Sequence, residues 1–347
     1  MNKIFTEKVD SFLNKYYEDN KISGSLRVTV KDEVIYKSSF GYADEEKKLP
    51  FTEKSMFTLY SLSKPFCAIG LLKLKDRNLI DLDLHPCVYL PEANGFDKAV
   101  TIKQLLNHTS GIPDFEQNTD FQQKYVGETS QQLREMLLLI SNHEMLFSPG
   151  TQGFYANINF IICALIIENV SGMDYAEYMK SEVFEPLGMF DTYIDHKELL
   201  LKNRVTGHKK EGDKIFPVRS AKEWLLGAGD IISTIDDVYC LNKAIKHRLL
   251  LAPDTWDEVF TPSPYHSMGL GCTITDWHGM KRITHNGGYI GFRTMHVQVP
   301  EKDFDVILLS NSGWGEGRYH IIEAVYDSYY GNNDAPGEKV NMDMGYI

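Results

Sequence analysis

Strand-like segments occur at both ends of this chain, and helix-like segments fill its middle. Residues 25–43 alternate apolar and polar side chains around a short polar turn, which predicts a β-hairpin, and strand-like runs return within residues 268–310. Residues 65–202 have a mostly helical periodicity, and amphipathic patterns predict helices over residues 4–19 and 319–330. We therefore expect an α+β fold whose central antiparallel sheet is built from both chain ends and flanked by helices.

The same pattern predicts how the chain divides. We expect a single domain over residues 1–330, in which a mostly helical part is inserted into a sheet part. The sheet part comprises about residues 1–75 and 216–330, and the helical part about residues 76–215. The polar segment 331–347 is expected to be a loosely attached tail.

Charge and composition exclude several classes of partner. The formal net charge of −12 argues against a nucleic-acid or anionic-membrane partner. The longest apolar run, residues 160–167, is far shorter than the ~20 residues that a membrane span needs. The N-terminal residues 1–17 contain no uninterrupted apolar stretch of a signal peptide, and the five cysteines form no C-x-x-C motif (Cys67, Cys87, Cys163, Cys240 and Cys272). We expect free thiols and a cytoplasmic location, and the sequence leaves the oligomeric state open.

A serine and a lysine stand three residues apart in the segment TLYSLSKPFCAIGLLKLKD, residues 58–76. On a helix, positions i and i+3 share a face, so Lys64 can reach the Ser61 hydroxyl, whereas Ser63 faces elsewhere. The free N–H groups of a helix start favour the negative charge that develops when a serine attacks a carbonyl. Burial favours the neutral amine of a lysine, which is the form that acts as a base. A plain helix start with a solvated lysine is the alternative.

A tyrosine and an asparagine follow a Pro-Gly turn in the segment FSPGTQGFYANINF, residues 147–160. The phenol of Tyr155 can carry a proton, and the amide of Asn157 can hold both a lysine and a substrate carbonyl. These two groups would complement the pair of Ser61 and Lys64. A helix N-terminus with a packed tyrosine is the alternative.

The segment ITHNGGYIGF, residues 283–292, places a histidine before two glycines. Gly287 and Gly288 would leave a strand edge free of side chains against which substrate can lie. The N–H of Gly288 could be one donor to an oxyanion. A hairpin turn at Asn286 and Gly287 is the alternative.

Together these segments resemble the serine β-lactamase and penicillin-binding-protein superfamily, most closely its class C-like branch of esterases and D-amino-acid peptidases. The S-x-x-K element matches Ser61 to Lys64, and the Tyr-x-Asn element matches Tyr155 to Asn157. The third element, often His-x-Gly in this branch, matches His285 to Gly287. The resemblance spans roughly residues 24–327 in the order of the family.

The resemblance implies a β-lactamase/transpeptidase-like fold and a serine hydrolase that forms a covalent acyl-enzyme. Ser61 would be the nucleophile, Lys64 and Tyr155 would share its proton, and either could be the general base. The N–H groups of Ser61 and Gly288 would bind the oxyanion. Asn157, His285 and Gly287 would position Lys64 and substrate. No cofactor or metal is implied, and the partner would be a small ester, amide or lactam.

Two positions depart from the family pattern. His285 stands where related enzymes carry a lysine, so it offers no permanent charge to a substrate carboxylate. Asp230 stands where members usually carry a glycine. We expect an esterase or amidase of small acyl substrates first, a D-amino-acid peptidase second and a β-lactamase third. A non-catalytic binding protein on the same fold is the alternative from another class.

For one further histidine and for most of the aromatic candidates, the sequence predicts a structural role. His108 follows a helical run in LLNHTSG, which predicts a helix-capping histidine. Trp224, Tyr289 and Trp314 could line a cleft, and we expect only Tyr289 to do so because it follows the two glycines. The sequence contains neither an H-E-x-x-H metal motif nor a G-x-S-x-G nucleophile elbow.

Overall fold

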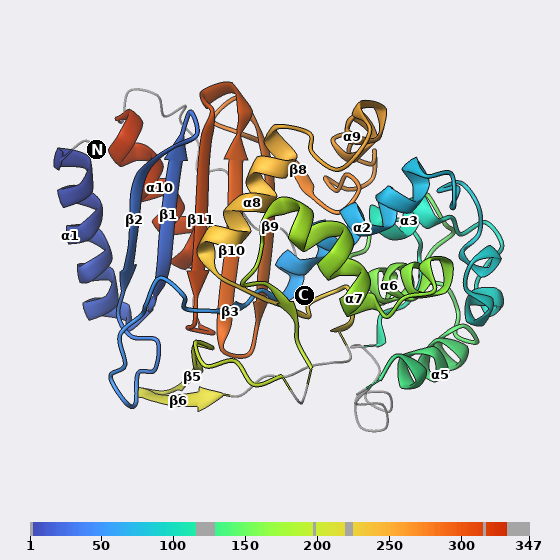
Figure 1. The fold of residues 1–347 in the computed structure, drawn as a ribbon, viewed down its shortest axis with the longest axis horizontal. Helices are drawn as coiled ribbons and strands as arrows, with labels where there is room; N and C mark the ends of the chain where they lie inside the picture. The colour runs from blue at the N-terminus through green and yellow to red at the C-terminus, as the bar shows by residue number, and fades with distance from the viewer. Residues whose placement is uncertain (1–2, 116–128, 197–198, 219–224, 315–316, 332–347) are drawn as a thin grey trace.

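A six-stranded antiparallel sheet occupies the left half of the molecule in Figure 1, beside a mostly helical half. The computed structural model describes residues 3–115, 129–196, 199–218, 225–314 and 317–331. The strands run in the order β2-β1-β11-β10-β9-β8, and their bounds are β1 Gly24–Val30, β2 Glu33–Phe40, β8 Thr273–Trp277, β9 Met280–Tyr289, β10 Phe292–Val299 and β11 Phe304–Ser310. The sheet from both chain ends, predicted from the sequence, is therefore confirmed.

The pairing of β1 with β11 joins the two ends of the chain. Leu26 lies opposite Leu308 in an antiparallel register. The hairpin between β1 and β2 turns through Lys31 and Asp32, both with a positive φ, of 52° and 62°. Two consecutive residues of this conformation match the twist of the flanking strands.

Helices cover both faces of the sheet and separate two apolar cores (Figure 1). On one face, α1 (Lys3–Asn20) and α10 (Gly317–Tyr330) pack with the sheet residues Val306 and Leu308. On the other, Ile307 and Leu309 join the larger core, to which α8 (Ile235–Lys246) contributes. This alternation is the period of two that a strand buried on both faces requires.

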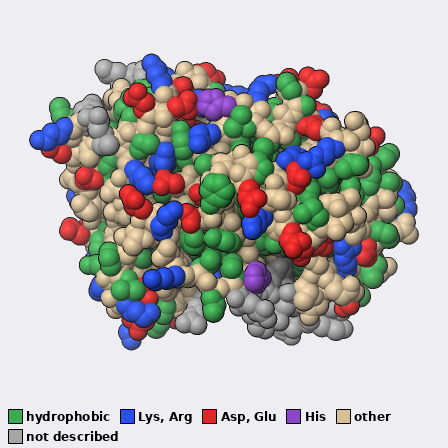
Figure 2. Space-filling view, viewed as in Figure 1, with side chains coloured by type: hydrophobic (Ala, Val, Ile, Leu, Met, Phe, Trp, Pro, Cys, Tyr) green, Lys and Arg blue, Asp and Glu red, His purple; other side chains and the backbone are tan. Residues whose placement is uncertain are grey.

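Charged side chains tie α8 to the sheet. Asp236 in the first turn of α8 binds Arg27 of β1 and Lys37 of β2, each at 2.6 Å. Positive and negative side chains are interspersed over the face that carries α8 (Figure 2). Thr234 caps this helix by accepting the N–H of Asp237 at 3.2 Å, and a threonine three residues before an acidic residue is a common sequence signal for a helix start.

The helical part of the molecule packs around two buried helices. α2 (Lys64–Asp76) and α6 (Asn157–Ser171) contribute most of their side chains to the larger core. A helix that is apolar all round, such as α6, belongs in an interior. The other helices here are α3 Ile102–Leu106, α5 Ser130–Ile140, α7 Tyr175–Met179, a π-helical turn Lys180–Phe184 and α9 Pro253–Val259.

Short strands connect the helical part to the sheet part. β3 (Phe57–Thr58) pairs with β7 (Ile231–Ser233), which also pairs with β4 (Tyr193–Ile194). β5 (Gly207–Glu211) and β6 (Lys214–Val218) form a hairpin that the sequence pattern does not predict, because its side chains are mostly exposed and do not alternate.

In the part of the chain that the structure describes, no single helix is long and apolar enough to cross a membrane. One pair of helices, Asn157–Ser171 with Tyr175–Leu187, is long and apolar enough when taken together, but the two are bent by 85° relative to each other.

Candidate active site

Ser61 lies in a tight turn between β3 and α2. The turn is a 3₁₀-helix, Tyr60–Ser63, that runs directly into α2. Tyr60, the residue before Ser61, has a φ of 49°, a left-handed conformation that is unfavourable for a bulky side chain and persists only where the surrounding structure imposes it. Ser61 is half-buried, whereas the hydroxyl of the fully buried Ser63 accepts the N–H of Ile231 at 3.0 Å. The Ser63 hydroxyl is therefore used in a hydrogen bond to β7, whereas the Ser61 hydroxyl faces Lys64.

Lys64 is completely buried, and its ammonium group lies at the centre of the site. Its Nζ donates to Ser61 Oγ at 3.0 Å, to Asn157 Oδ1 at 2.7 Å and to the carbonyl of Ala228 at 2.8 Å. An ammonium group has three N–H donors, so these three acceptors offset the cost of burying it. The structure brings together two of the sequence-predicted elements at this nitrogen.

The start of α6 positions Asn157. Its backbone N–H donates to Asp114 Oδ2 at 2.6 Å, which supplies a cap where the N-cap residue Ala156 has no suitable side chain. Asp114 is buried and lies in a loop far from α6 in sequence. The local sequence gives Asp114 no signal, because nothing around it marks it as a cap for a helix more than forty residues away.

Tyr155 lies between Lys64 and His108. Its ring centre is 4.7 Å from Lys64 Nζ and 4.2 Å from the ring centre of His108. His108 is fully buried, and its Nδ1 accepts the N–H of Ala156 at 3.2 Å. Burial and the nearby Lys64 charge hold the pKa of His108 well below its ordinary value, so the ring stays neutral.

His108 ends α3 as the sequence predicts: it follows the C-cap residue with a left-handed φ of 57°, and its N–H donates to the carbonyl of Leu105 at 3.2 Å. Its ring does not cap α3 and instead contacts the start of α6, which the sequence did not predict. Its position beneath Tyr155 makes it part of the support of the site.

His285 reaches the site from β9. It is buried, and its ring centre is 6.3 Å from that of Tyr155. Its Nδ1 lies 2.7 Å from the carbonyl oxygen of Asn286, to which Nδ1–H donates. Burial, followed by the charge of Lys64, lowers the pKa of His285 to about 3. His285 is neutral at physiological pH.

The glycines of β9 allow this strand to lie against the turn that carries Ser61. A Cβ on Gly287 would fall 1.9 Å from the carbonyl oxygen of Leu59 and 2.5 Å from Thr294 Oγ1, so no larger residue fits without a shift. The strand continues through Gly288 to Tyr289 in register with β10. Asn286 and Gly287 therefore lie within a strand and not in a hairpin turn, which was the alternative. The turn between β9 and β10 lies at residues 290–291.

The aromatic candidates occupy different places. Tyr289 is half-buried and packs against Tyr60, with ring centres 5.7 Å apart. Trp314 packs against the core on the far face of the sheet, and its Nε1 donates to the carbonyl of Asn20 at 3.1 Å. Trp224 lies outside the described residues. Of these candidates within the described residues, Tyr289 contacts the Ser61 turn and Trp314 does not, and the lining of a substrate cleft by Tyr289 stays a prediction.

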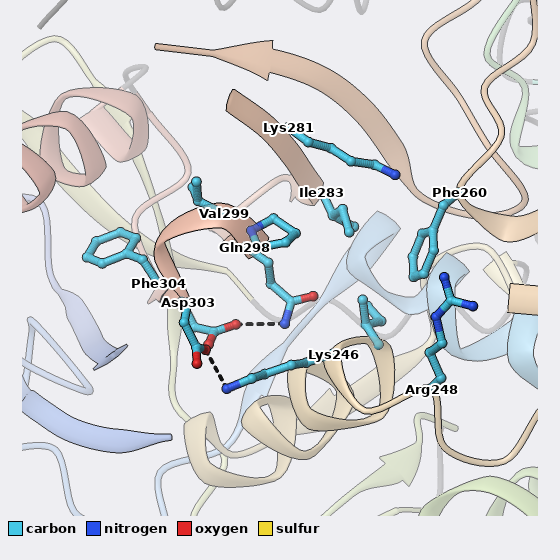
Figure 3. A pocket seen from close by; sticks show the side chains of 12 residues that line it. Lys246, Arg248, Phe260, Lys281, Ile283, Gln298, Val299, Asp303 and Phe304 are labelled. Atoms are coloured by element: carbon cyan, nitrogen blue, oxygen red, sulfur yellow. Dashed lines mark hydrogen bonds and ion pairs between the residues drawn. The ribbon is translucent and has the colours of Figure 1, made fainter. Parts of the chain in front are cut away.

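A separate cavity of about 340 Å³ lies at the other end of β9 (Figure 3). It is lined by Lys281 and Ile283 of that strand, and none of the candidate catalytic residues contributes to it. Within the described ranges, no three His, Cys, Asp or Glu side chains are grouped as metal ligands, and all five cysteines are free thiols.

The comparison with protein families agrees with this geometry, because the beta-lactamase family model matches residues 2–325. The chain belongs to the beta-lactamase family. Members of this family are serine hydrolases, so the prediction of an enzyme of this type is confirmed. Penicillin-binding protein 4* of Bacillus subtilis is 28% identical over 323 residues, which cover 85% of this chain and 69% of that protein.

Solved structures of other proteins share the fold. The octameric penicillin-binding protein homologue from Pyrococcus abyssi superposes with a TM-score of 0.82 at 25% identity, over 94% of this chain and 78% of that chain. D-amino acid amidase from Ochrobactrum anthropi SV3 gives a TM-score of 0.81 at 22% identity, over 93% of this chain and 98% of that chain. The predicted β-lactamase/transpeptidase-like fold is therefore confirmed.

Proposed function

We propose that this beta-lactamase-family protein hydrolyses small esters or amides through an acyl-enzyme on Ser61. The observation that carries the proposal is the buried Lys64, whose Nζ lies 3.0 Å from Ser61 Oγ. A contact of this length lets a proton pass between the two groups. The hydrogen bonds from Lys64 to Asn157 and Ala228 keep Nζ directed at Ser61.

The reaction would proceed in two steps. Ser61 Oγ attacks the substrate carbonyl, its proton passes to Lys64 or Tyr155, and the same proton is delivered to the leaving alcohol or amine as its bond to carbon breaks. Water then attacks the acyl-enzyme and gives a proton to Lys64 or Tyr155, which passes it to Ser61 Oγ as the bond between Oγ and the acyl carbon breaks and the acid leaves. The N–H groups of Ser61 and Gly288 would bind the oxyanion in both steps.

We expect this enzyme to prefer esters and amides whose binding does not depend on a carboxylate group of the substrate. This expectation rests on His285. Related enzymes that hold a carboxylate use a fixed cation at this position, whereas His285 is buried with its pKa lowered to about 3. A neutral ring can donate or accept one hydrogen bond but provides no ion pair. A D-amino-acid amide is the second candidate, because D-amino acid amidase from Ochrobactrum anthropi SV3 has the same fold.

Covalent labelling tests the nucleophile. We expect a fluorophosphonate or a β-lactam to label the wild-type protein and not Ser61→Ala, while Ser63→Ala is still labelled if it folds. Labelling that persists in Ser61→Ala would refute the assignment. Activity no higher than that of Ser61→Ala across a broad ester and amide panel would favour the non-catalytic binding protein instead.

A substrate panel tests the ranking. We would compare kcat/KM for short p-nitrophenyl esters, D-alanyl amides and a chromogenic cephalosporin. The esters or amides should exceed the cephalosporin. A cephalosporin that wins by more than about tenfold, a difference worth about 1.4 kcal/mol of transition-state binding, would reverse the order.

A further inference from the structure

Asp230 is a buried carboxyl group in the turn that precedes β7. Its exposed fraction is 2%, and its Oδ2 accepts the backbone N–H of Gly227 at 2.8 Å. Its own backbone carbonyl accepts the N–H of Asp195 at 2.6 Å. Burial of a carboxyl group is costly unless it is hydrogen-bonded, so its presence here calls for a physical reason.

The turn that Asp230 closes also supplies a hydrogen-bond acceptor to Lys64. The carbonyl of Ala228 accepts a hydrogen bond from Lys64 Nζ at 2.8 Å. The N–H groups of Ala228 and Gly229 both donate to the carbonyl of Leu225 at 2.8 Å, so the peptide groups of this turn are fixed from one side by Leu225 and from the other by Asp230.

The turn fits tightly against the helices of the site. Gly227 has a φ of 70°, and a Cβ there would fall 2.8 Å from both Ala164 Cβ and the carbonyl oxygen of Phe160 in α6. A Cβ on Gly229 would lie 3.4 Å from the backbone of Tyr60, the residue before Ser61. A shift of this turn would therefore displace the carbonyl that accepts the hydrogen bond of Lys64. It would also bring the turn into steric contact with the backbone of Tyr60, next to Ser61.

We propose that Asp230 is a positioning residue for Lys64, which it serves by accepting the N–H of Gly227 and so holding the Ala228 carbonyl in place. Of the three acceptors around Lys64 Nζ, the Ala228 carbonyl is a backbone group and depends on the conformation of its turn. This inference rests on the proposed function, in which Lys64 assists Ser61.

The charge of Asp230 adds a dependence on pH. The groups that face it are Lys64 and Cys67 of α2, Tyr175 of α7 and Asp195 after β4. Burial raises the pKa of Asp230 to about 7, with a further rise from Asp195 and an opposing effect of Lys64. The carboxyl group therefore gains its negative charge near neutral pH. That charge favours the Lys64 ammonium, which cannot take the proton of Ser61.

Two variants of Asp230 separate the hydrogen bond from the charge. Asp230→Asn keeps an oxygen that can accept the Gly227 N–H and removes the charge, whereas Asp230→Ala removes both. Asp305→Asn, which changes a buried carboxyl group on β11 near the remote cavity, is the matched control. The readouts are kcat and KM for a p-nitrophenyl ester between pH 5.5 and 8.5, the rate of fluorophosphonate labelling, and thermal unfolding.

We expect Asp230→Ala to lower kcat by about tenfold or more with little change in KM, because misplacement of a catalytic group by a fraction of an ångström costs rate and not substrate affinity. Asp230→Asn should keep kcat within about threefold of wild type at pH 6, and the ratio of wild-type to Asp230→Asn activity should fall as pH rises through about 7. Asp305→Asn should have the wild-type profile.

Three results separate the possible failures. Wild-type kcat and profile in Asp230→Ala, with Ser61-dependent labelling intact, would overturn this inference alone. If Asp230→Ala does not fold, Asp230→Leu fills the same buried place without an acceptor for the Gly227 N–H, and a wild-type kcat in that variant would overturn the inference. A wild-type protein that neither turns over esters nor is labelled at Ser61 would overturn the proposed function and this inference with it.

Discussion

Gly287 lies so close to Leu59 that a Cβ on it would fall 1.9 Å from the Leu59 carbonyl oxygen. The same oxygen accepts a hydrogen bond from Thr294 Oγ1 at 2.7 Å, so it cannot move away without breaking that bond. The strand β9 and the segment just before Ser61 are thus held together by a contact that only glycine permits. This contact sets the width of the site between Ser61 and the edge of the sheet.

Gly287→Ala should displace β9 from the Ser61 turn. We expect activity toward a p-nitrophenyl ester to fall by about a hundredfold, because small misplacements at a catalytic site have effects of this size. Gly288→Ala is the control, since its Cβ would meet side-chain atoms and no backbone, those of Arg293 at 3.0 Å and Arg318 at 3.2 Å, and its N–H is kept. Equal losses in the two variants would contradict the role of the Leu59 contact.

Two substitutions of His108 should show how much its hydrogen bond to the Ala156 N–H contributes to the free energy of unfolding. His108→Asn places a polar group where Nδ1 meets the Ala156 N–H and tolerates the left-handed φ of 57°, whereas His108→Ala provides neither. Both lose the ring that packs on Tyr155. We expect His108→Ala to lose about 2–4 kcal/mol of unfolding free energy and His108→Asn less, measured by urea denaturation. If the two are equally stable, the Ala156 hydrogen bond has no part in holding α6.

Exchange of His285 for lysine should change substrate preference. A fixed cation at this position can pair with a carboxylate, so kcat/KM for a chromogenic cephalosporin relative to a p-nitrophenyl ester should rise by about tenfold in His285→Lys. His285→Gln, which is neutral like the native ring, should leave that ratio within about threefold of wild type. A rise in both variants would show that shape and not charge governs the preference.

Asp305 should make stability depend on pH. Burial raises the pKa of this carboxyl group from 3.8 to about 6, although Gln298 Nε2 donates to it at 2.6 Å. Because the folded state holds the proton that the unfolded state releases, wild-type stability is lost as pH rises from about 4 to about 6.

The neutral variant Asp305→Asn avoids this loss. Its unfolding free energy relative to wild type should therefore increase across that window, by at most about 1.4 kcal/mol per pH unit, and then level off. Urea denaturation at pH 4, 5, 6 and 7 measures the difference. A difference that is flat over this range would show that the Asp305 carboxyl titrates at its ordinary pKa.

Several features of the molecule could be read directly from local sequence. The period of two in residues 25–43 and the turn at Lys31 and Asp32 predict the hairpin, because side-chain alternation and turn conformation are local properties. The cap at Thr234 and the spacing of Ser61 and Lys64 are local in the same sense. Each depends on contacts between residues only a few positions apart.

The resemblance to a family supplied what spacing could not. Ser61, Tyr155 and His285 lie far apart in sequence, and no periodicity predicts that one site contains them. Their order along the chain, matched to the family pattern, suggested the grouping. The structure then placed Lys64 Nζ 3.0 Å from Ser61 Oγ and 4.7 Å from the Tyr155 ring.

Tertiary structure alone decided the support of the site. His108 and Asp114 are buried polar residues whose side chains accept N–H groups at the start of α6, and nothing in the local sequence assigns them this role. Asp230 accepts an N–H of its own turn, but only the fold buries it and places that turn against Lys64. The ionisation of His285 and Asp230 likewise depends on how completely the folded chain excludes water from them. Residue type and spacing determined which groups could react, whereas burial and long-range packing set their charges and the position of Lys64.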